Sequence, residues 1–263
     1  MNTFERRKKI VEMVNGTGSQ LVNDISARLG VTDVTVRADL RLLEEQGLLT
    51  RFHGGAARIG NPSPALSPSE TQEISLSERY MLAADPKRRI AIEAARMVRE
   101  GDTIILDSGS TTKLLAEELA TMKNITVITN NLPAVNILVG NTDITLVVCG
   151  GTVRHKTVSL HGSIAEYALR GVSADLMFVG ADGLDCENGI TTFNEGYAVS
   201  AVMAAAAQKV VVLTDSTKFS RKGFNVVLPV EKIDVIITDS EAPDEAVIRL
   251  REKGKTVILA DTH

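Results

Sequence analysis

The chain has 263 residues, of which 44% are hydrophobic and 24% are charged, and its formal net charge is −4. This composition excludes a disordered chain and supplies enough apolar residues for one large or two unequal domains. No apolar run approaches membrane-spanning length, and two cysteines are too few for a disulfide scaffold. We therefore expect a cytoplasmic protein with no membrane segment.

The charge is distributed unevenly along the chain. Residues 1–58 hold nine Lys or Arg against seven Asp or Glu, a net of +2, and the remainder holds 20 against 26, a net of −6. The smaller N-terminal part is thus the basic one, which favours nucleic-acid binding there. Because +2 is modest, we expect tight DNA binding to need a homo-oligomer, a dimer or tetramer, on repeated half-sites.

Three helices are predicted at the N-terminus. The first covers about residues 4–15, and the second begins near Val22 and closes at a turn around Gly30. The third runs from an N-cap at Thr32 to a stop at Gly47. The second and third helices have the spacing of a helix-turn-helix, whose second helix reads the DNA major groove.

The third helix has two distinct faces. Val36, Leu40 and Leu43 recur at helical spacing and predict a stripe that packs inward. The outer face combines short side chains with two arginines, which suits base edges, thymine methyl groups and phosphates. Taken alone, the segment is more typical of an ordinary amphipathic surface helix. The candidate DNA-binding residues on it are Thr32, Val34, Thr35, Arg37, Ala38 and Arg41.

Two further features belong to this N-terminal part. Asp39 would be repelled by phosphates, so we expect it to act as a cap or to form an ion pair within the domain. Residues 48–58 predict two short strands around Gly54-Gly55, a wing on which Arg51, His53 and Arg58 are candidates for contacts with phosphates or the minor groove.

These residues together resemble the DeoR family of bacterial sugar-metabolism repressors. The resemblance implies a winged helix-turn-helix that binds double-stranded operator DNA. Ala38 departs from the family pattern, because many members carry a basic residue there, which leaves the operator sequence open. The matching residues are Arg6, Ile10, Val14, Thr32, the run Thr35-Val36-Arg37-Ala38-Asp39-Leu40, and Arg51-Phe52-His53-Gly54-Gly55.

The second part of the chain predicts an α/β domain. Residues 59–74, with three prolines and small polar residues, predict an extended linker, and helices are expected over about residues 73–84 and 87–99. Residues 75–263 then alternate apolar β-branched runs with helix-length segments, which predicts a mainly parallel sheet with ligands at the carboxyl ends of its strands. The strands are expected at residues 103–106, 126–128, 145–148, 176–179, 209–213, 235–238 and 256–259.

Polar residues follow several of these strands. The Gly/Ser/Thr turn after the first strand opens a helix and offers backbone N–H groups and hydroxyls to a phosphate, although such turns are common without a ligand. It is no Walker loop, because it lacks Gly-Lys-Ser/Thr. Asn131 and Asp182, each taken alone, are more typical of helix caps or turns. The candidate ligand-binding residues are Asp107, Ser108, Gly109, Ser110, Thr111, Thr112, Thr129, Asn130, Asn131, Gly150, Gly151, Arg154, Asp182, Asn194, Glu195 and Lys218.

This second part also resembles the sensor domain of the DeoR family, which is similar in fold to ribose-5-phosphate isomerase. The resemblance covers nearly all of residues 75–263 and is closest to repressors of hexitol operons, such as those for galactitol or glucitol. It implies a phosphorylated sugar as effector, with its phosphate held by the loop from Ser108 to Thr112.

The alternative function is a sugar-phosphate isomerase that carries a DNA-binding appendage. Asp182, Asp185 and Glu195 are candidate bases for proton transfer, and Lys218 is a candidate cation. The segment after Asp185 lacks the lysine and glycine run of the isomerases, so we expect binding without turnover. The four scattered histidines and two cysteines predict no metal site, and we expect no cofactor.

A small-residue helix is predicted over residues 194–207, beginning at the candidate ligand site. It is a candidate route by which a ligand changes the geometry of an oligomer. A plain core helix fits its almost wholly apolar composition slightly better.

Overall fold

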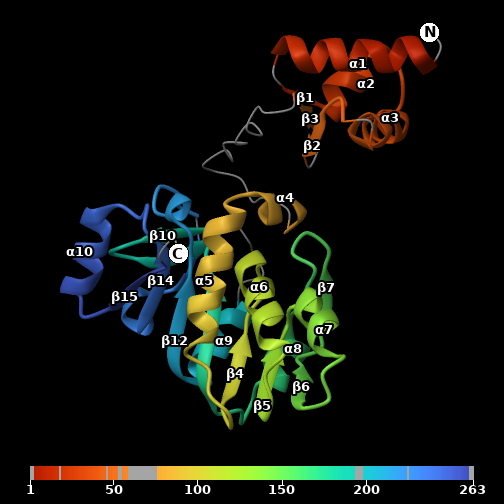
Figure 1. The fold of residues 1–263 in the computed structure, drawn as a ribbon. Coiled ribbons are helices and arrows are strands. Elements are labelled where there is room, and N and C mark those ends of the chain that lie inside the picture. The colour runs from red at the N-terminus through yellow and green to blue at the C-terminus, as the bar shows by residue number, and fades with distance from the viewer. Residues whose placement is uncertain are drawn as a thin grey trace. The chain divides into compact units, whose positions relative to one another are not determined.

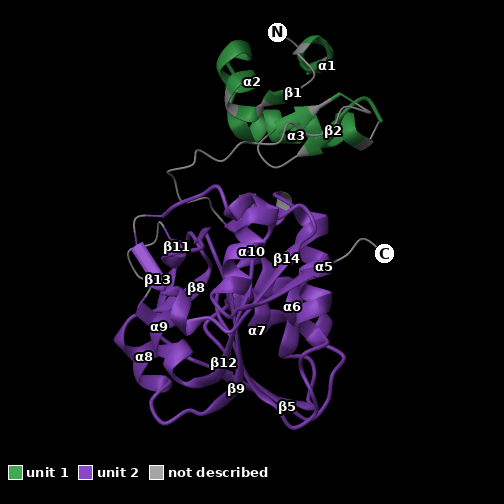
Figure 2. Cartoon of the chain, turned by 90° about the vertical axis from the view of Figure 1, so that its left-hand side faces the viewer, with its two compact units in different colours: residues 1–67 green, residues 68–263 purple. Residues whose placement is uncertain are grey.

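The computed structural model describes residues 3–17, 19–45, 47–52, 55–58, 76–192, 198–223 and 225–260. The chain divides into two compact units, residues 1–67 and residues 68–263 (Figure 2). The predicted linker, residues 59–74, lies outside the described residues.

The first unit is a winged helix-turn-helix with the three predicted helices and the predicted wing. A three-residue strand that the sequence did not predict pairs with the hairpin, giving a three-stranded antiparallel sheet in the order β1-β3-β2. Nine buried apolar residues, among them Ile10, Val36 and Leu40, form the unit's own core. The elements are α1 (Thr3–Thr17), β1 (Ser19–Leu21), α2 (Val22–Leu29), α3 (Asp33–Glu45), β2 (Thr50–Phe52) and β3 (Gly55–Ala57).

The second unit is built on a seven-stranded sheet in which every pairing is parallel. All seven predicted strands are present in it, so the predicted α/β class with a mainly parallel sheet is confirmed. In sheet order the strands are β15 (Thr256–Ala260), β14 (Val235–Asp239), β12 (Ala207–Leu213), β9 (Ala174–Gly180), β4 (Thr103–Leu106), β5 (Ile125–Thr129) and β6 (Ile144–Val148).

Helices cover both faces of this sheet (Figure 1). Alternate strand residues face opposite sides: Ile104 and Leu106 pack with α5, α6 and α7, and Ile105 packs in the core that includes residues of α8, α9 and α10. The helices are α4 (Leu76–Met81), α5 (Ala84–Ala95), α6 (Ser110–Leu119), α7 (Leu132–Leu138), α8 (Ser163–Ala168), α9 (Ala198–Ala205) and α10 (Asp244–Glu252), with two 3-10 turns, η1 (Ser216–Lys218) and η2 (Val230–Lys232).

Three predicted helices have different bounds in the structure. The helix expected at residues 73–84 is described as α4 and ends at Met81, because Ala84 is already the first residue of α5. The helix expected at residues 87–99 begins earlier, at Ala84, and ends at Ala95. The helix expected at residues 194–207 is described only as α9, and its predicted end is wrong, because Ala207 is already the first residue of β12. Residues 193–197 lie outside the described residues.

Five short strands were not predicted. They form a hairpin and a three-stranded antiparallel sheet beside the main sheet. These strands are β7 (Thr152–Arg154), β8 (Ser159–His161), β10 (Gly183–Asp185), β11 (Gly189–Thr192) and β13 (Asn225–Leu228).

The order of the strands defines where a ligand site is expected. From β4 the chain adds β5 and β6 on one side, and then β9, β12, β14 and β15 on the other. The direction of winding therefore changes between β4 and β9, and the carboxyl ends of strands at such a switch point diverge to leave a crevice.

Candidate DNA-binding face and effector pocket

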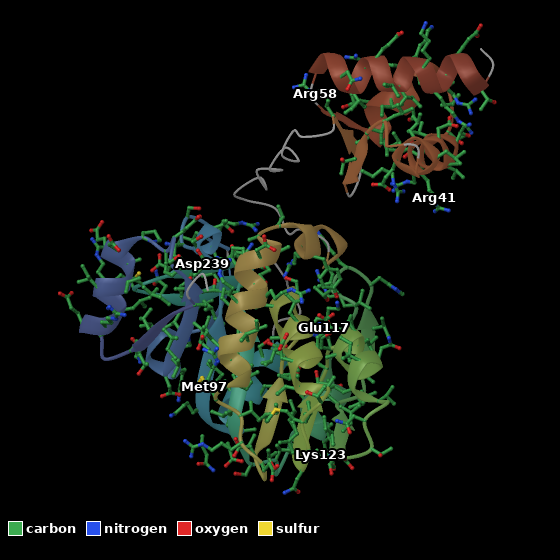
Figure 3. The ribbon with its side chains drawn as sticks, in the orientation of Figure 1. Arg41, Arg58, Met97, Glu117, Lys123 and Asp239 are labelled. Atoms are coloured by element: carbon green, nitrogen blue, oxygen red, sulfur yellow. The ribbon has the colours of Figure 1, made fainter. Side chains whose placement is uncertain are left out.

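The two faces of α3 are arranged as the sequence predicted. Val36, Leu40 and Leu43 are buried, whereas Arg37 and Arg41 are exposed. Figure 3 shows Arg41 extending outward from α3. Ala38 is also exposed, Val34 is 76% exposed, and Thr35 is partly exposed. The helix thus presents an outer face of two guanidinium groups and short side chains.

Both ends of α3 are set by the predicted residues. The Thr32 hydroxyl accepts a hydrogen bond from the Thr35 backbone N–H at 3.3 Å, as an N-cap does. At the other end, Gly47 adopts a left-handed conformation with φ of 66°, and the Leu48 N–H donates to the Leu43 carbonyl at 2.9 Å. The cap role of Thr32 and the stop at Gly47 are therefore confirmed.

Asp39 lies on the inner side of α3 and is buried. The Nε atoms of Arg6 and Arg7, on α1, donate to its two carboxylate oxygens at 2.5 and 2.8 Å. Burial alone would raise the pKa of Asp39, but the two arginines outweigh it and hold that pKa below its usual value. The expectation of an ion pair within the domain is confirmed, and it joins α1 to the recognition helix.

Arg51 on the wing has a partner that the sequence reasoning missed. Its Nε donates to a carboxylate oxygen of Glu44 on α3 at 2.6 Å, and its backbone N–H donates to the other oxygen at 2.9 Å. The side-chain hydrogen bond from Arg51 lowers the pKa of Glu44. Arg51 therefore holds the wing against the recognition helix. His53 lies outside the described residues, and Arg58 is exposed.

A pocket lies at the switch point between β4 and β9. Its empty volume, counted out to the solvent-open mouth, is about 770 Å³. Seven of the candidate ligand-binding residues line it: Asp107, Ser108, Gly109, Ser110, Thr111, Asp182 and Lys218. The other polar lining residues are not among these candidates: Arg79, Lys87, Thr157, His161, Thr191, Thr192, Ser200, Thr214 and Asp215.

The other described candidates lie away from the pocket lining. Asn131 is fully buried, and its Nδ2 donates to the Gly109 carbonyl at 3.3 Å and to the Thr112 hydroxyl at 3.2 Å. Its Oδ1 caps α7 by accepting from the Ala134 N–H at 3.3 Å. The Thr129 hydroxyl donates to the Leu106 carbonyl at 2.7 Å. These residues hold the loop after β4 from behind.

Asn130, Gly150, Gly151 and Arg154 are also outside the lining of this pocket. The Asn130 amide donates to the Leu160 carbonyl at 3.3 Å, and an Arg154 Nη1 donates to the Thr157 hydroxyl at 3.4 Å. Asn194 and Glu195 lie outside the described residues, so the structure does not place them.

The pocket wall contains two cations from the segment before β4. Arg79, on α4, forms an ion pair with Asp182, with Nη2 and Oδ1 2.8 Å apart. Lys87, on the first turn of α5, is almost completely buried, and its Nζ is 3.9 Å from a carboxylate oxygen of Asp215. A lysine in the first turn of a helix is unfavourable, because its positive charge lies next to the positive end of the helix dipole. This position was the feature of the sequence that could have indicated a functional role for Lys87.

The electrostatics of the pocket favour an anion. Burial lowers the pKa of Lys87 to about 7 against the attraction of Asp215, and it lowers the pKa of Lys218 as well. Asp107 is also buried, and burial raises its pKa although Ser200 donates a hydrogen bond to it at 2.5 Å. A ligand anion would compensate buried cations that the local carboxylates satisfy only in part.

The winged helix-turn-helix and the α/β unit with its polar pocket define a class of protein, a ligand-responsive DNA-binding regulator. Comparison with known families agrees. Residues 6–61 match the DeoR-like helix-turn-helix domain, and residues 82–240 match the DeoR C-terminal sensor domain. The chain belongs to the DeoR family.

Relatives along nearly the whole chain are transcriptional regulators. The lactose phosphotransferase system repressor of Streptococcus mutans is 35% identical, over 93% of this chain and 95% of the relative. The HTH-type transcriptional regulators GlpR of Haloferax volcanii and GolR of Listeria innocua are 33% and 32% identical, over 97% and 99% of this chain and 96% and 100% of the relatives. The chain is therefore a DNA-binding regulator and not an enzyme.

The similarity to solved structures concerns the fold. Ribose 5-phosphate isomerase A from Methanocaldococcus jannaschii is 22% identical, with a TM-score of 0.39 over 51% of this chain and 54% of that protein. Within the described ranges, no helix is long and apolar enough to span a bilayer, and no group of three or more His, Cys, Asp or Glu side chains is arranged to hold a metal ion.

Proposed function

We propose that the chain represses a sugar or sugar-alcohol catabolic operon and that a phosphorylated sugar, bound in the pocket between β4 and β9, controls it. The observation that carries this proposal is the convergence of Arg79, Lys87 and Lys218 on a pocket that is also lined by a Ser/Gly/Thr loop at a helix N-terminus. Buried cations and free backbone N–H groups are the groups that bind phosphate.

The remainder of the pocket suits the sugar part of such a ligand. Hydroxyls of Thr157, Thr191 and Ser200 line it with His161, and carbohydrate hydroxyls need such paired donors and acceptors. The names of relatives support a sugar-derived effector, since one relative is a lactose phosphotransferase system repressor. Which sugar the effector contains, a hexitol phosphate included, stays a prediction.

For DNA, we propose that Arg37 and Arg41 contact the operator together with Val34 and Thr35, which precede them on α3. The exposure of this face and the inward ion pair of Asp39 support that orientation. The net charge of +2 on residues 1–58 supports a dimer or tetramer, because one such unit supplies few phosphate contacts. Arg51 acts chiefly by positioning the wing through Glu44.

The test of the effector proposal is a thermal-shift screen of sugar phosphates beside the corresponding free sugars. A ligand that binds only the folded state raises the melting temperature, and we expect a shift with the phosphates alone. Gly109→Val is the matched loop variant, because Gly109 has φ of 157° and ψ of 166°, a conformation open essentially to glycine. Equal shifts from free sugars and their phosphates would contradict a phosphate site.

A further inference from the structure

The α4 strap, residues 76–83, joins the pocket to the chain that leads from the DNA-binding unit. It is the first described part of the second unit after residues 59–75. At its start the buried Leu76 donates its N–H to the Lys156 carbonyl at 3.0 Å. Further along the strap, the Lys113 Nζ, on α6, lies 5.1 Å from the centroid of the Tyr80 ring.

Polar contacts of two cations, Arg79 and Lys87, tie this strap to the pocket. The Arg79 side chain is paired with Asp182, which in turn accepts a hydrogen bond from the Thr192 hydroxyl at 2.7 Å. The Lys87 ammonium donates to two strap carbonyls, that of Arg79 at 2.7 Å and that of Leu82 at 2.5 Å. The position of the strap therefore depends on two cations that also line the pocket.

The turn between the strap and α5 has an unusual backbone. Ala83 adopts a left-handed conformation, with φ of 49° and ψ of 46°, which a non-glycine residue rarely adopts. Lys87 binds the carbonyl of the residue immediately before it. Loss of the Lys87 contacts would allow Ala83 to relax, and the strap would then leave its present position.

We propose that the α4 strap is a release device for the anion that enters the pocket. The anion takes Arg79 from Asp182 and draws the Lys87 ammonium from the strap carbonyls, because a phosphate group carries about −1.5 to −2 charge at pH 7, whereas a carboxylate carries a single charge and a carbonyl none. The strap then loses these contacts with the pocket while those of Leu76 and Tyr80 remain, and it becomes a weaker anchor for the chain that leads to the DNA-binding unit. This inference rests on the proposed function, since it requires an anion in the pocket.

The test is hydrogen exchange on the full-length protein, with inorganic phosphate as the probe and sodium chloride at matched ionic strength as its control. Phosphate should slow exchange in residues 108–112, where it binds. In residues 76–83 it should speed exchange by about fivefold or more, the lower range of typical coupling between two sites.

Three variants separate the strap from the pocket. Asp182→Asn removes the carboxylate partner but keeps the Arg79 guanidinium, and it should give fast exchange in the strap without phosphate. Arg79→Lys keeps a charge but loses the planar guanidinium, and it should reduce the phosphate effect on the strap. Arg88→Met, which removes an exposed charge from the same turn of α5, should behave as the native protein does.

The outcomes distinguish this inference from the function on which it rests. Slower exchange in residues 108–112 with unchanged or slower exchange in the strap would overturn the release device and leave the anion site intact. Unchanged exchange in both segments at saturating phosphate would overturn the anion site, and the device with it.

Discussion

Replacing Asn131 with Ala tests whether this residue supports the phosphate loop or binds the ligand itself. Its side chain is fully buried and links α7 to the start of α6: it caps α7 through Ala134, and it donates to the Gly109 carbonyl in the loop and to the Thr112 hydroxyl in the first turn of α6. An alanine there removes the cap and leaves the Gly109 carbonyl without this donor. The loop then loses the contact that fixes it against β5.

The magnitude follows from these contacts. Loss of an N-cap costs about 0.5 to 2 kcal/mol, and each of the two lost hydrogen bonds to Gly109 and Thr112 contributes about 0.5 to 1.5 kcal/mol, since both partners keep other hydrogen bonds. We therefore expect the second unit to lose about 2 to 4 kcal/mol, with a melting temperature lower by about 2 to 4 °C for each kcal/mol in a unit of this size. Anion affinity should fall as well, because the loop N–H groups are no longer held in place.

The matched control is Asn141→Ala. Asn141 donates to the Ala120 and Met122 carbonyls at 2.9 and 2.8 Å, and it does not line the pocket. It should destabilise the unit while leaving inorganic phosphate binding unchanged. Both variants can be measured by calorimetry, with and without phosphate. A loss below about 0.5 kcal/mol for Asn131→Ala, the size of an ordinary surface substitution, would refute the support role.

Three further predictions concern single side chains. Arg37→Ala should weaken specific operator binding by about 1 to 3 kcal/mol at fixed salt, and an unchanged affinity would remove α3 from the interface. Asp39→Asn should speed hydrogen exchange in α1 and α3, because it removes the ion pairs with Arg6 and Arg7. The folded-state pKa of Asp39 is lowered, so the stabilisation by these ion pairs is present above the unfolded-state pKa and is lost as pH falls through the folded-state pKa. A difference between variant and native protein that persists in acid would contradict the ion pair. Sulfate, which does not titrate near neutrality, should bind less tightly as pH rises above the Lys87 pKa of about 7, at most about tenfold per pH unit, and Lys87→Met should abolish that slope.

The main sheet and the recognition helix were predictable because each is specified by local pattern. The central strands of the parallel sheet are buried on both faces, so each appears as a continuous apolar run rich in β-branched residues, for example Thr103–Leu106. The inward stripe of α3 follows from its 3.6-residue period. The short antiparallel strands carry no such pattern: Gly183–Asp185 becomes a strand only because Gly189–Thr192 folds back on it.

The candidate site was predicted in part, and the misses have a geometric cause. From the sequence, the loops after all of the strands were assigned to one site, as if every strand ended at the same distance from the switch point. In the structure β6 is an edge strand, and β4 and β5 separate it from β9. Neighbouring strands lie about 4.8 Å apart, so the loop that contains Gly150 and Gly151 begins well to the side of the switch point. Arg79 and Lys87 were missed because only residues that follow a strand were considered. These two residues precede the first strand of the sheet, and only the packing of α4 and α5 brings them to the pocket.

Control through the geometry of an oligomer and control through release of the α4 strap are compatible, because the first concerns how subunits assemble and the second acts within each subunit. An oligomer supplies a second DNA-binding unit near the second half-site, and its contribution depends on effective concentration, which falls when the connecting chain is loosened. Release of the α4 strap would loosen that chain in each subunit, so an anion in the pocket would weaken binding to a paired site more than binding to a single half-site. Because coupling is reciprocal, operator DNA would weaken anion binding by the same factor. The direction of control proposed here is therefore release of the operator by the effector.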